Sequence, residues 1–272
     1  MIPKFSRLSL VLAPLVGSAI AANSVTYDFE TPSSSGDLFE AGGVTGWSQD
    51  TSNPTAFGQT FPLAYISATD FGGGSSNSAH LGTQVANTPD NADTTLTGDL
   101  SSLDPIYNML NVSFNMAVLD DSADSFEGRD AFNVALTTAS GSQVATIGFS
   151  PTAGNNEVWD VSVGVNGSTS TTPQTISANS GYNFYISSRD NTTSFSYGAG
   201  DGSGLTIGLG SFVAETSLNS ITGITFEHDP LSEVGTSANT LAFDNLTVQI
   251  PEPSSSLLMV LSAGLIAIRR RR

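Results

Sequence analysis

The chain has 272 residues, a formal net charge of −17, two histidines and no cysteine. The absence of cysteine excludes disulfide frameworks, cysteine nucleophiles and thiolate metal sites. Because phosphate binding needs lysine and arginine, the acidic balance also argues against nucleic acid as a partner. The length suits one or two domains with a sizeable core.

Positive charge is concentrated at the two ends of the chain. Six of the eight basic residues lie in the first seven or the last four positions. Between Ala22 and Ile250 there are 24 acidic residues and only two basic ones, Arg129 and Arg189, so this stretch has a net charge of −22. The chain therefore divides into an acidic, hydroxyl-rich body and two basic, apolar ends.

Residues 1–21 have the three parts of a secretory signal peptide. Lys4 and Arg7 supply positive charge, residues 8–20 are apolar, and Ala19-Ile20-Ala21 fits the small-x-small cleavage pattern. We expect a signal helix that signal peptidase removes after Ala21. The alternative is a buried N-terminal helix.

Residues 251–272 contain a second signal. Pro251-Glu252-Pro253 precedes an apolar run at 257–268 and four terminal arginines. The run is short for a membrane span, which needs about 20 apolar residues. The arginines would hold the C-terminus on the cytoplasmic side. We therefore expect a short apolar transmembrane helix in the inner membrane, with the body outside it.

The order of these elements resembles the PEP-CTERM sorting signal of Gram-negative bacteria, a segment also called the ice-binding protein C-terminal domain. The resemblance covers residues 250–272. It implies that an exosortase, a transpeptidase-like membrane enzyme, recognises Pro251, Glu252 and Pro253. The tail would then be removed, as in a GPI signal, and the body would reach the cell surface or extracellular matrix.

The body, residues 22–250, is predicted to be all-β. Period-two alternation of apolar and polar residues marks four strands, at 111–118, 132–136, 159–165 and 182–186. Further strands are expected at 25–29, 61–67, 143–149, 193–197, 205–213, 221–226 and 240–248. Asn166-Gly167 favours a tight hairpin turn. Many short strands with such turns predict a two-sheet antiparallel β-sandwich, specifically a jelly roll, with a β-helix as the alternative.

The two ends of the body carry a second resemblance. Tyr27-Asp28-Phe29-Glu30, a following Trp47 and the closing Phe243-Asp244-Asn245-Leu246 are similar to jelly-roll carbohydrate-binding modules and lectin-like sandwiches. The resemblance implies that the first and last strands are neighbours. It also implies a structural calcium held by Glu30 and Asp244, with Asp28 as a third ligand. The alternative is a set of exposed acids on edge strands.

Three aromatic residues are candidates for stacking on sugar rings. Trp159 shares its parity with Val161 and Val163 and is therefore expected in the core. Trp47 follows a glycine in a predicted loop and is the better candidate for an exposed ligand-binding ring, with a buried structural role as the alternative for it and for Tyr65. Tyr65 is ambiguous.

Catalytic signals are weak. His80 and His228 are expected at the surface or the rim rather than in a triad. Jelly-roll laminarinase-type hydrolases place acidic residues alternately on one strand, and Glu227, Asp229 and Glu233 match this pattern only in part. The third acid follows the first by six residues, and Pro230 interrupts the strand. The acidic run Asp120, Asp121, Asp124, Glu127 and Asp130 is expected to be a solvated connection, with a calcium loop as the alternative.

The sequence thus predicts an exported surface or matrix protein that is not an enzyme and that binds polysaccharide, with no cofactor other than calcium. Two alternatives remain open. One is a glycan hydrolase or lyase that uses carboxylates. The other is an ice-binding or adhesive surface protein, although the body lacks a regular Thr-x-Thr array.

Overall fold

The computed structural model of the protein describes fourteen stretches of the body. The described residues are 23–30, 44–50, 55–56, 59–60, 63–68, 77–82, 93–103, 109–120, 129–155, 157–189, 192–199, 207–213, 220–230 and 239–250. The predicted signal peptide with Ala21, and the sorting segment with Pro251, Glu252 and Pro253, lie outside them. None of the described segments is a helix long and apolar enough to cross a membrane.

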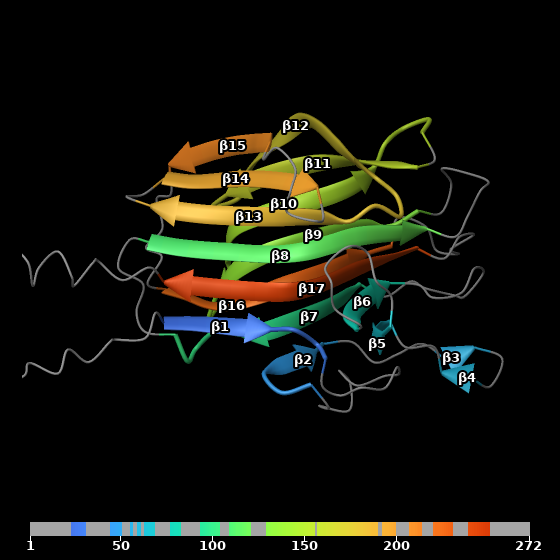
Figure 1. Ribbon diagram of the computed structural model, residues 1–272, viewed down its shortest axis with the longest axis horizontal. Helices are drawn as coiled ribbons and strands as arrows, with labels where there is room; N and C mark the ends of the chain where they lie inside the picture. Colours follow the sequence, from blue (N-terminus) through green and yellow to red (C-terminus); the bar gives the residue numbers. More distant parts are fainter. Residues whose placement is uncertain are drawn as a thin grey trace, which may run out of the picture.

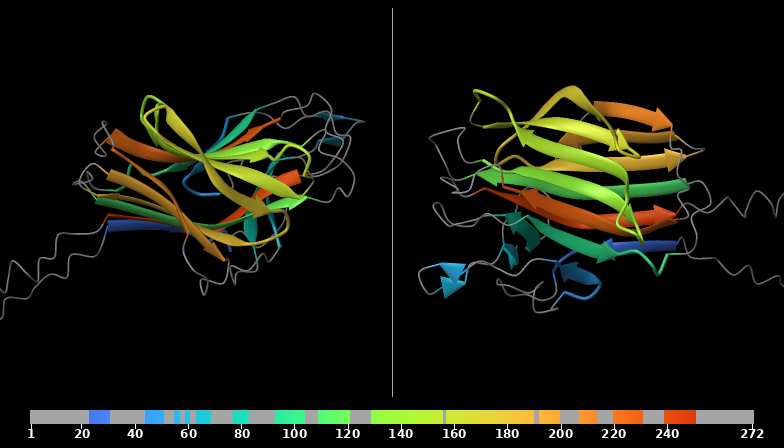
Figure 2. Two further views of the ribbon diagram at one scale, coloured as in Figure 1. Left: turned by 90° about the horizontal axis from the view of Figure 1, so that it is seen from above. Right: turned by 180° about the vertical axis from the view of Figure 1, so that it is seen from behind.

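Two antiparallel sheets pack face to face, which confirms the prediction of an all-β sandwich (Figures 1 and 2). The larger sheet has the order β15-β14-β13-β8-β17-β6-β5, and β1 also pairs with β17. Its strands are β1 (Asn23–Tyr27), β5 (Ala64–Ser67), β6 (Ser78–Gly82), β8 (Met109–Asp120), β13 (Tyr182–Arg189), β14 (Thr192–Ala199), β15 (Ile207–Val213) and β17 (Asn239–Ile250).

The second sheet has seven strands in the order β12-β11-β10-β9-β16-β7-β2. Its strands are β2 (Trp47–Gln49), β7 (Thr94–Asp99), β9 (Ala131–Thr138), β10 (Gln143–Pro151), β11 (Val158–Val165), β12 (Ser168–Ser177) and β16 (Ile221–Asp229). A separate two-stranded ribbon consists of β3 (Thr55–Ala56) and β4 (Gln59–Thr60).

The first and last strands are neighbours, as the resemblance to carbohydrate-binding modules implied. All five residues of β1 pair with β17, from Asn23 opposite Ile250 to Tyr27 opposite Leu246 (Figure 1). Strand β6 pairs with the other half of the same edge, where Ala79 lies opposite Phe243. The two ends of the body are therefore held together by backbone hydrogen bonds.

Aromatic rings from both sheets fill the space between them. Phe226 of β16 and Phe243 of β17 stack with ring centroids 3.8 Å apart and an interplanar angle of 6°. Trp47 packs 5.9 Å from Phe226 and 5.8 Å from Phe243. Trp159 is fully buried, as its parity predicted.

Four strands of the two large sheets were not predicted, and neither was the ribbon of β3 and β4. Strand β6 is buried on both faces and shows no alternation, and β2 is only three residues long. Strand β7 alternates threonines with buried residues, and β12 is a serine- and threonine-rich edge strand that contains Pro173. Each lacks the strong apolar alternation by which strands are recognised.

Gly98 on β7 leaves space for the ring of Trp47, which lies opposite it on the neighbouring strand β2. A Cβ at this position would lie 3.0 Å from Trp47 Cζ2 and 3.2 Å from Ile224 Cγ2. We predict that Gly98→Ala lowers the free energy of unfolding by about 1–3 kcal/mol through overpacking. The matched control is Gly208→Ala, where no atom lies within 4 Å, and we expect a change of no more than about 0.5 kcal/mol. Urea denaturation measures both, and equal effects would contradict the prediction.

Candidate functional site: a polar groove on the seven-stranded sheet

A groove of about 620 Å³ lies on the outer face of the seven-stranded sheet. It runs over β2, β7, β16 and the end of β9. Its lining is dominated by hydroxyl and carboxylate side chains and by glycines. The lining residues are Gly46, Trp47, Ser48, Thr95, Thr97, Asp99, Thr137, Thr138, Ala139, Gly141, Thr222, Gly223, Thr225 and Glu227.

The pleat of two adjacent strands places the polar side chains in this groove. On β7, Thr94, Leu96 and Gly98 are buried, whereas Thr95, Thr97 and Asp99 alternate with them toward the outside. On β16, Ile224 and Phe226 belong to the core, so Thr225 and Glu227 point outward. Thr95 lies directly opposite Glu227 in the register, and Asp99 lies opposite Gly223.

The carboxylate of Glu227 is oriented by two neighbouring amides. Asn133 Nδ2 donates to Glu227 Oε2 at 2.9 Å, and Gln143 Nε2 donates to Oε1 at 3.0 Å and to Oε2 at 3.2 Å. Both donors come from adjacent strands, β9 and β10. Both donors are uncharged amides, so they fix the position of the carboxylate and place no positive charge beside it.

Asp99 marks the opposite end of the groove. The Ser101 N–H donates to Asp99 Oδ1 at 2.8 Å, and hydrogen bonds from Ser101 hold the pKa of this carboxyl below its usual range. The Tyr27 hydroxyl donates to the Asp99 carbonyl at 2.9 Å. Burial and the nearby Asp99 charge raise the pKa of Tyr27. Asp99 is therefore ionised over the whole physiological range.

The two carboxylates are widely separated along the sheet. Asp99 and the residue opposite Glu227 are four positions apart on β7, which at about 3.3 Å per residue corresponds to about 13 Å. Glycosidases place their two carboxyl groups about 5–5.5 Å or about 6.5–9.5 Å apart. The spacing therefore suits contacts with a bound chain better than acid–base cleavage of one bond.

The prediction that Trp47 presents an exposed ring is wrong. Trp47 is 6% exposed and belongs to β2, where its ring packs between Tyr27, Phe226 and Phe243. It borders the groove as part of the wall. The large apolar area of an indole drove it into the core, although the flanking glycine had indicated a loop.

Glu30, Asp28 and Asp244 lie near the point where β1 and β6 meet along β17. Glu30 Oε1 accepts the Asn77 N–H at 3.4 Å, and Asp28 Oδ1 accepts the Glu30 N–H at 3.4 Å. Asp244 is fully buried, and its Oδ2 accepts Asn245 Nδ2 at 3.0 Å. Among the described residues, no three Asp, Glu or His side chains gather closely enough to hold a metal ion. A calcium ion here would therefore have to draw carbonyl oxygens into its ligand set.

Both histidines are buried, which corrects the expectation that they lie at the surface. His228 is 1% exposed, and its Nε2 lies 2.7 Å from Asp130 Oδ2. His80 is 2% exposed, its Nε2 lies 2.9 Å from Ser78 Oγ, and its ring packs 4.9 Å from that of Tyr65. Burial raises the pKa of Tyr65 to about 12. Neither histidine reaches the groove.

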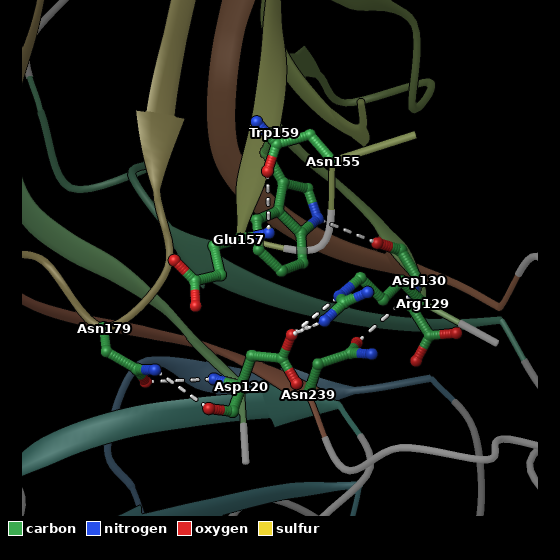
Figure 3. Close-up of polar contacts among 8 residues, drawn as sticks. All are labelled: Asp120, Arg129, Asp130, Asn155, Glu157, Trp159, Asn179 and Asn239. Atoms are coloured by element: carbon green, nitrogen blue, oxygen red, sulfur yellow. Dashed lines mark hydrogen bonds and ion pairs between the residues drawn. The ribbon is translucent and has the colours of Figure 1, made fainter. Parts of the chain in front are cut away.

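A buried ionic network closes one end of the sandwich (Figure 3). Arg129 forms an ion pair with Asp120 at 2.6 Å and lies 5.7 Å from the Trp159 ring centroid. Trp159 Nε1 donates to the Asp130 carbonyl at 3.2 Å. The expectation of a solvated acidic connection is therefore wrong for Asp120 and Asp130. The other three acids of the run lie outside the described residues.

The other residues considered for catalysis are not assembled into a site. Asp229 is exposed at the end of β16, and Glu233 lies outside the described residues. The sequence did not indicate a site role for five of the residues described above: Thr95, Thr97, Asp99, Asn133 and Gln143. The only sequence signal for them is the alternation Thr95-x-Thr97-x-Asp99, which indicates a polar outer face but no groove.

No protein-family model matches the sequence, and neither does any curated protein. Solved structures do match. The CBM2 module of the evolved Dit of Lactobacillus casei BL23 phage J-1 is 14% identical with a TM-score of 0.50, over 85% of this chain and 99% of that one. The GH131 β-glucanase catalytic domain of Podospora anserina is 11% identical with a TM-score of 0.51, over 81% and 93%. The likeness is one of fold, that of a two-sheet β-sandwich.

His80 makes the stability of the protein dependent on pH. Burial lowers its pKa from 6.5 to about 4, so the unfolded chain binds a proton at pH values where the folded protein does not. The stabilisation is complete above about pH 6.5 and is lost as the pH falls to about 4, a total of about 3 kcal/mol. We predict that His80→Gln removes this part of the pH dependence, measured by urea denaturation from pH 4 to 8. An unchanged slope in the variant would contradict the prediction.

Proposed function

We propose that the chain is an exported protein of the cell surface or extracellular matrix whose jelly-roll body binds polysaccharide without cleaving it. The observation that carries this proposal is the polar groove on the outer face of the seven-stranded sheet. The sandwich fold is shared with a carbohydrate-binding module and a β-glucanase domain. The terminal segments, with Ala21 and Pro251-Glu252-Pro253, support export by signal peptidase and sorting by an exosortase.

The groove has the chemistry that a sugar chain needs. Threonine hydroxyls act as donors and as acceptors, and the Glu227 and Asp99 carboxylates act as acceptors for sugar hydroxyls. Glu227 is already held by Asn133 and Gln143, so its side chain loses little conformational entropy when a ligand binds.

Filling the groove tests the proposal. We predict that Thr97→Trp weakens binding to polysaccharide at least about tenfold, because the indole would occupy the space over β7. The measurement is affinity electrophoresis of the full chain against a panel of soluble neutral, acidic and amine-bearing polysaccharides. Thr171→Trp on the exposed edge strand β12 is the matched control and should bind as the wild type does.

Three outcomes of that experiment overturn the proposal. Failure of the wild type to bind any of the panel removes the polysaccharide function. Equal binding by Thr97→Trp and the wild type removes the groove as the site. Release of new reducing ends from a bound polysaccharide would replace a binding role by hydrolysis. Thermal unfolding of each variant verifies that it is folded.

Calcium at the junction of β1, β6 and β17 is the second part of the proposal. A fully buried carboxylate such as Asp244 is stable only when it is paired, hydrogen-bonded or bound to a metal. We predict that EDTA lowers the Tm of the wild type by several degrees and that added calcium restores it. The variant Asp244→Asn should have a Tm that EDTA does not change, whereas Asp160→Asn on β11 should respond as the wild type does. A wild-type Tm that is insensitive to EDTA would remove calcium from the proposal.

A further inference from the structure

No basic side chain of the body reaches the groove. Between Ala22 and Ile250 the sequence contains only Arg129, Arg189, His80 and His228 as basic residues, so this statement covers the whole body. Arg129 is 1% exposed and forms an ion pair with Asp120, and His228 is buried beside Asp130. Arg189 and His80 belong to β13 and β6 of the opposite sheet.

Negative charge, in contrast, lies at both ends of the groove. Glu227 and Asp99 are part of its lining. Asp50 lies next to the Thr95 end, where its Oδ1 accepts the Thr95 N–H at 2.8 Å. The hydrogen bonds to Glu227 come from the uncharged amides of Asn133 and Gln143, which orient the carboxylate without neutralising it.

From this charge distribution we infer that the groove selects glycans with free amino groups and rejects acidic glycans. The inference rests on the proposed polysaccharide-binding function and names the class of ligand. A protonated sugar amine placed near Glu227 or Asp99 gains a charge-assisted hydrogen bond. A uronic acid in the same place meets two carboxylates and no cation, so its desolvation and repulsion are uncompensated.

The spacing of Asp99 and Glu227 along the groove supports recognition of individual sugar units. The backbone positions of Asp99 and of Thr95, which lies opposite Glu227, are about 13 Å apart along β7, so the two carboxylates would contact different sugar units of one bound chain. Acidic polysaccharides are repelled at both ends. The net charge of −22 on the body adds a longer-range attraction for cationic chains, which salt screens beyond about 10 Å at 0.1 M.

Oligosaccharides of equal length separate these effects. The full chain is titrated calorimetrically at 0.15 M salt with the β-1,4-linked tetramer of glucosamine, the tetramer of N-acetylglucosamine and tetragalacturonate. The first two ligands differ only in whether the nitrogen is a free amine or an amide. We expect the glucosamine tetramer to bind at least about tenfold tighter than its acetylated form and tetragalacturonate not to bind.

Charge-neutralising variants locate the effect in the groove. Glu227→Gln should lose most of the preference for the glucosamine tetramer over the acetylated tetramer, because the protonated amine loses a charged acceptor. Asp160→Asn removes one charge from β11, outside the groove lining, and should leave the preference unchanged. Binding of the glucosamine tetramer should also weaken as rising pH deprotonates its amines, whereas binding of the acetylated tetramer should not.

The outcomes distinguish this inference from the proposed function. If the acetylated tetramer or tetragalacturonate binds as tightly as the glucosamine tetramer or more tightly, the amine preference is overturned. The proposed polysaccharide-binding function still stands in that case, provided that Thr97→Trp abolishes the binding. Equal loss in Asp160→Asn and Glu227→Gln would show general attraction to an acidic protein and overturns the inference. If none of the three tetramers binds and no polysaccharide of the panel binds, both proposals fail.

Discussion

The stacking of Phe226 on Phe243 is the contact on which the rest of the structure depends. It joins β16 of one sheet to β17 of the other, with ring centroids 3.8 Å apart. Because side chains alternate along a strand, fixing Phe226 inward fixes Thr225 and Glu227 outward. A slip of one residue would bury Glu227 and expose the phenylalanine. The polar face of the groove is therefore specified by the aromatic core behind it.

The scarcity of positive charge has an equally broad effect. The body has two arginines, and one of them, Arg129, is enclosed between the sheets with Asp120 and next to Trp159. Removing one partner of such a buried pair leaves an uncompensated charge. Since no basic side chain lines the groove, Glu227 and Asp99 give it a negative sign.

The sequence predicted those parts of the fold that alternate strongly. The segments at 111–118, 159–165 and 182–186 lie within β8, β11 and β13, and Asn166 and Gly167 adopt the positive φ angles expected of a hairpin turn. It failed where burial comes from tertiary packing, as for His80 and His228, which lie deep in the sandwich. The groove was missed because its lining comes from several strands, with Asp99 on β7 and Glu227 on β16, and because Asn133 and Gln143 reach Glu227 from β9 and β10. No local sequence pattern indicates that these residues come together.

An irregularity in β16 explains why the groove forms at this place. The pairing of β16 with β9 shifts register between Ile221 and Gly223, and Gly223 lies opposite Asp99 on the other side. A side chain on Gly223 would approach Thr137 Oγ1 within 2.9 Å, so the glycine keeps the floor of the groove open. Bulges commonly re-aim side chains beside functional sites. Here the register shift and Gly223 lie within the groove, between the carboxylates of Glu227 and Asp99 that mark its ends.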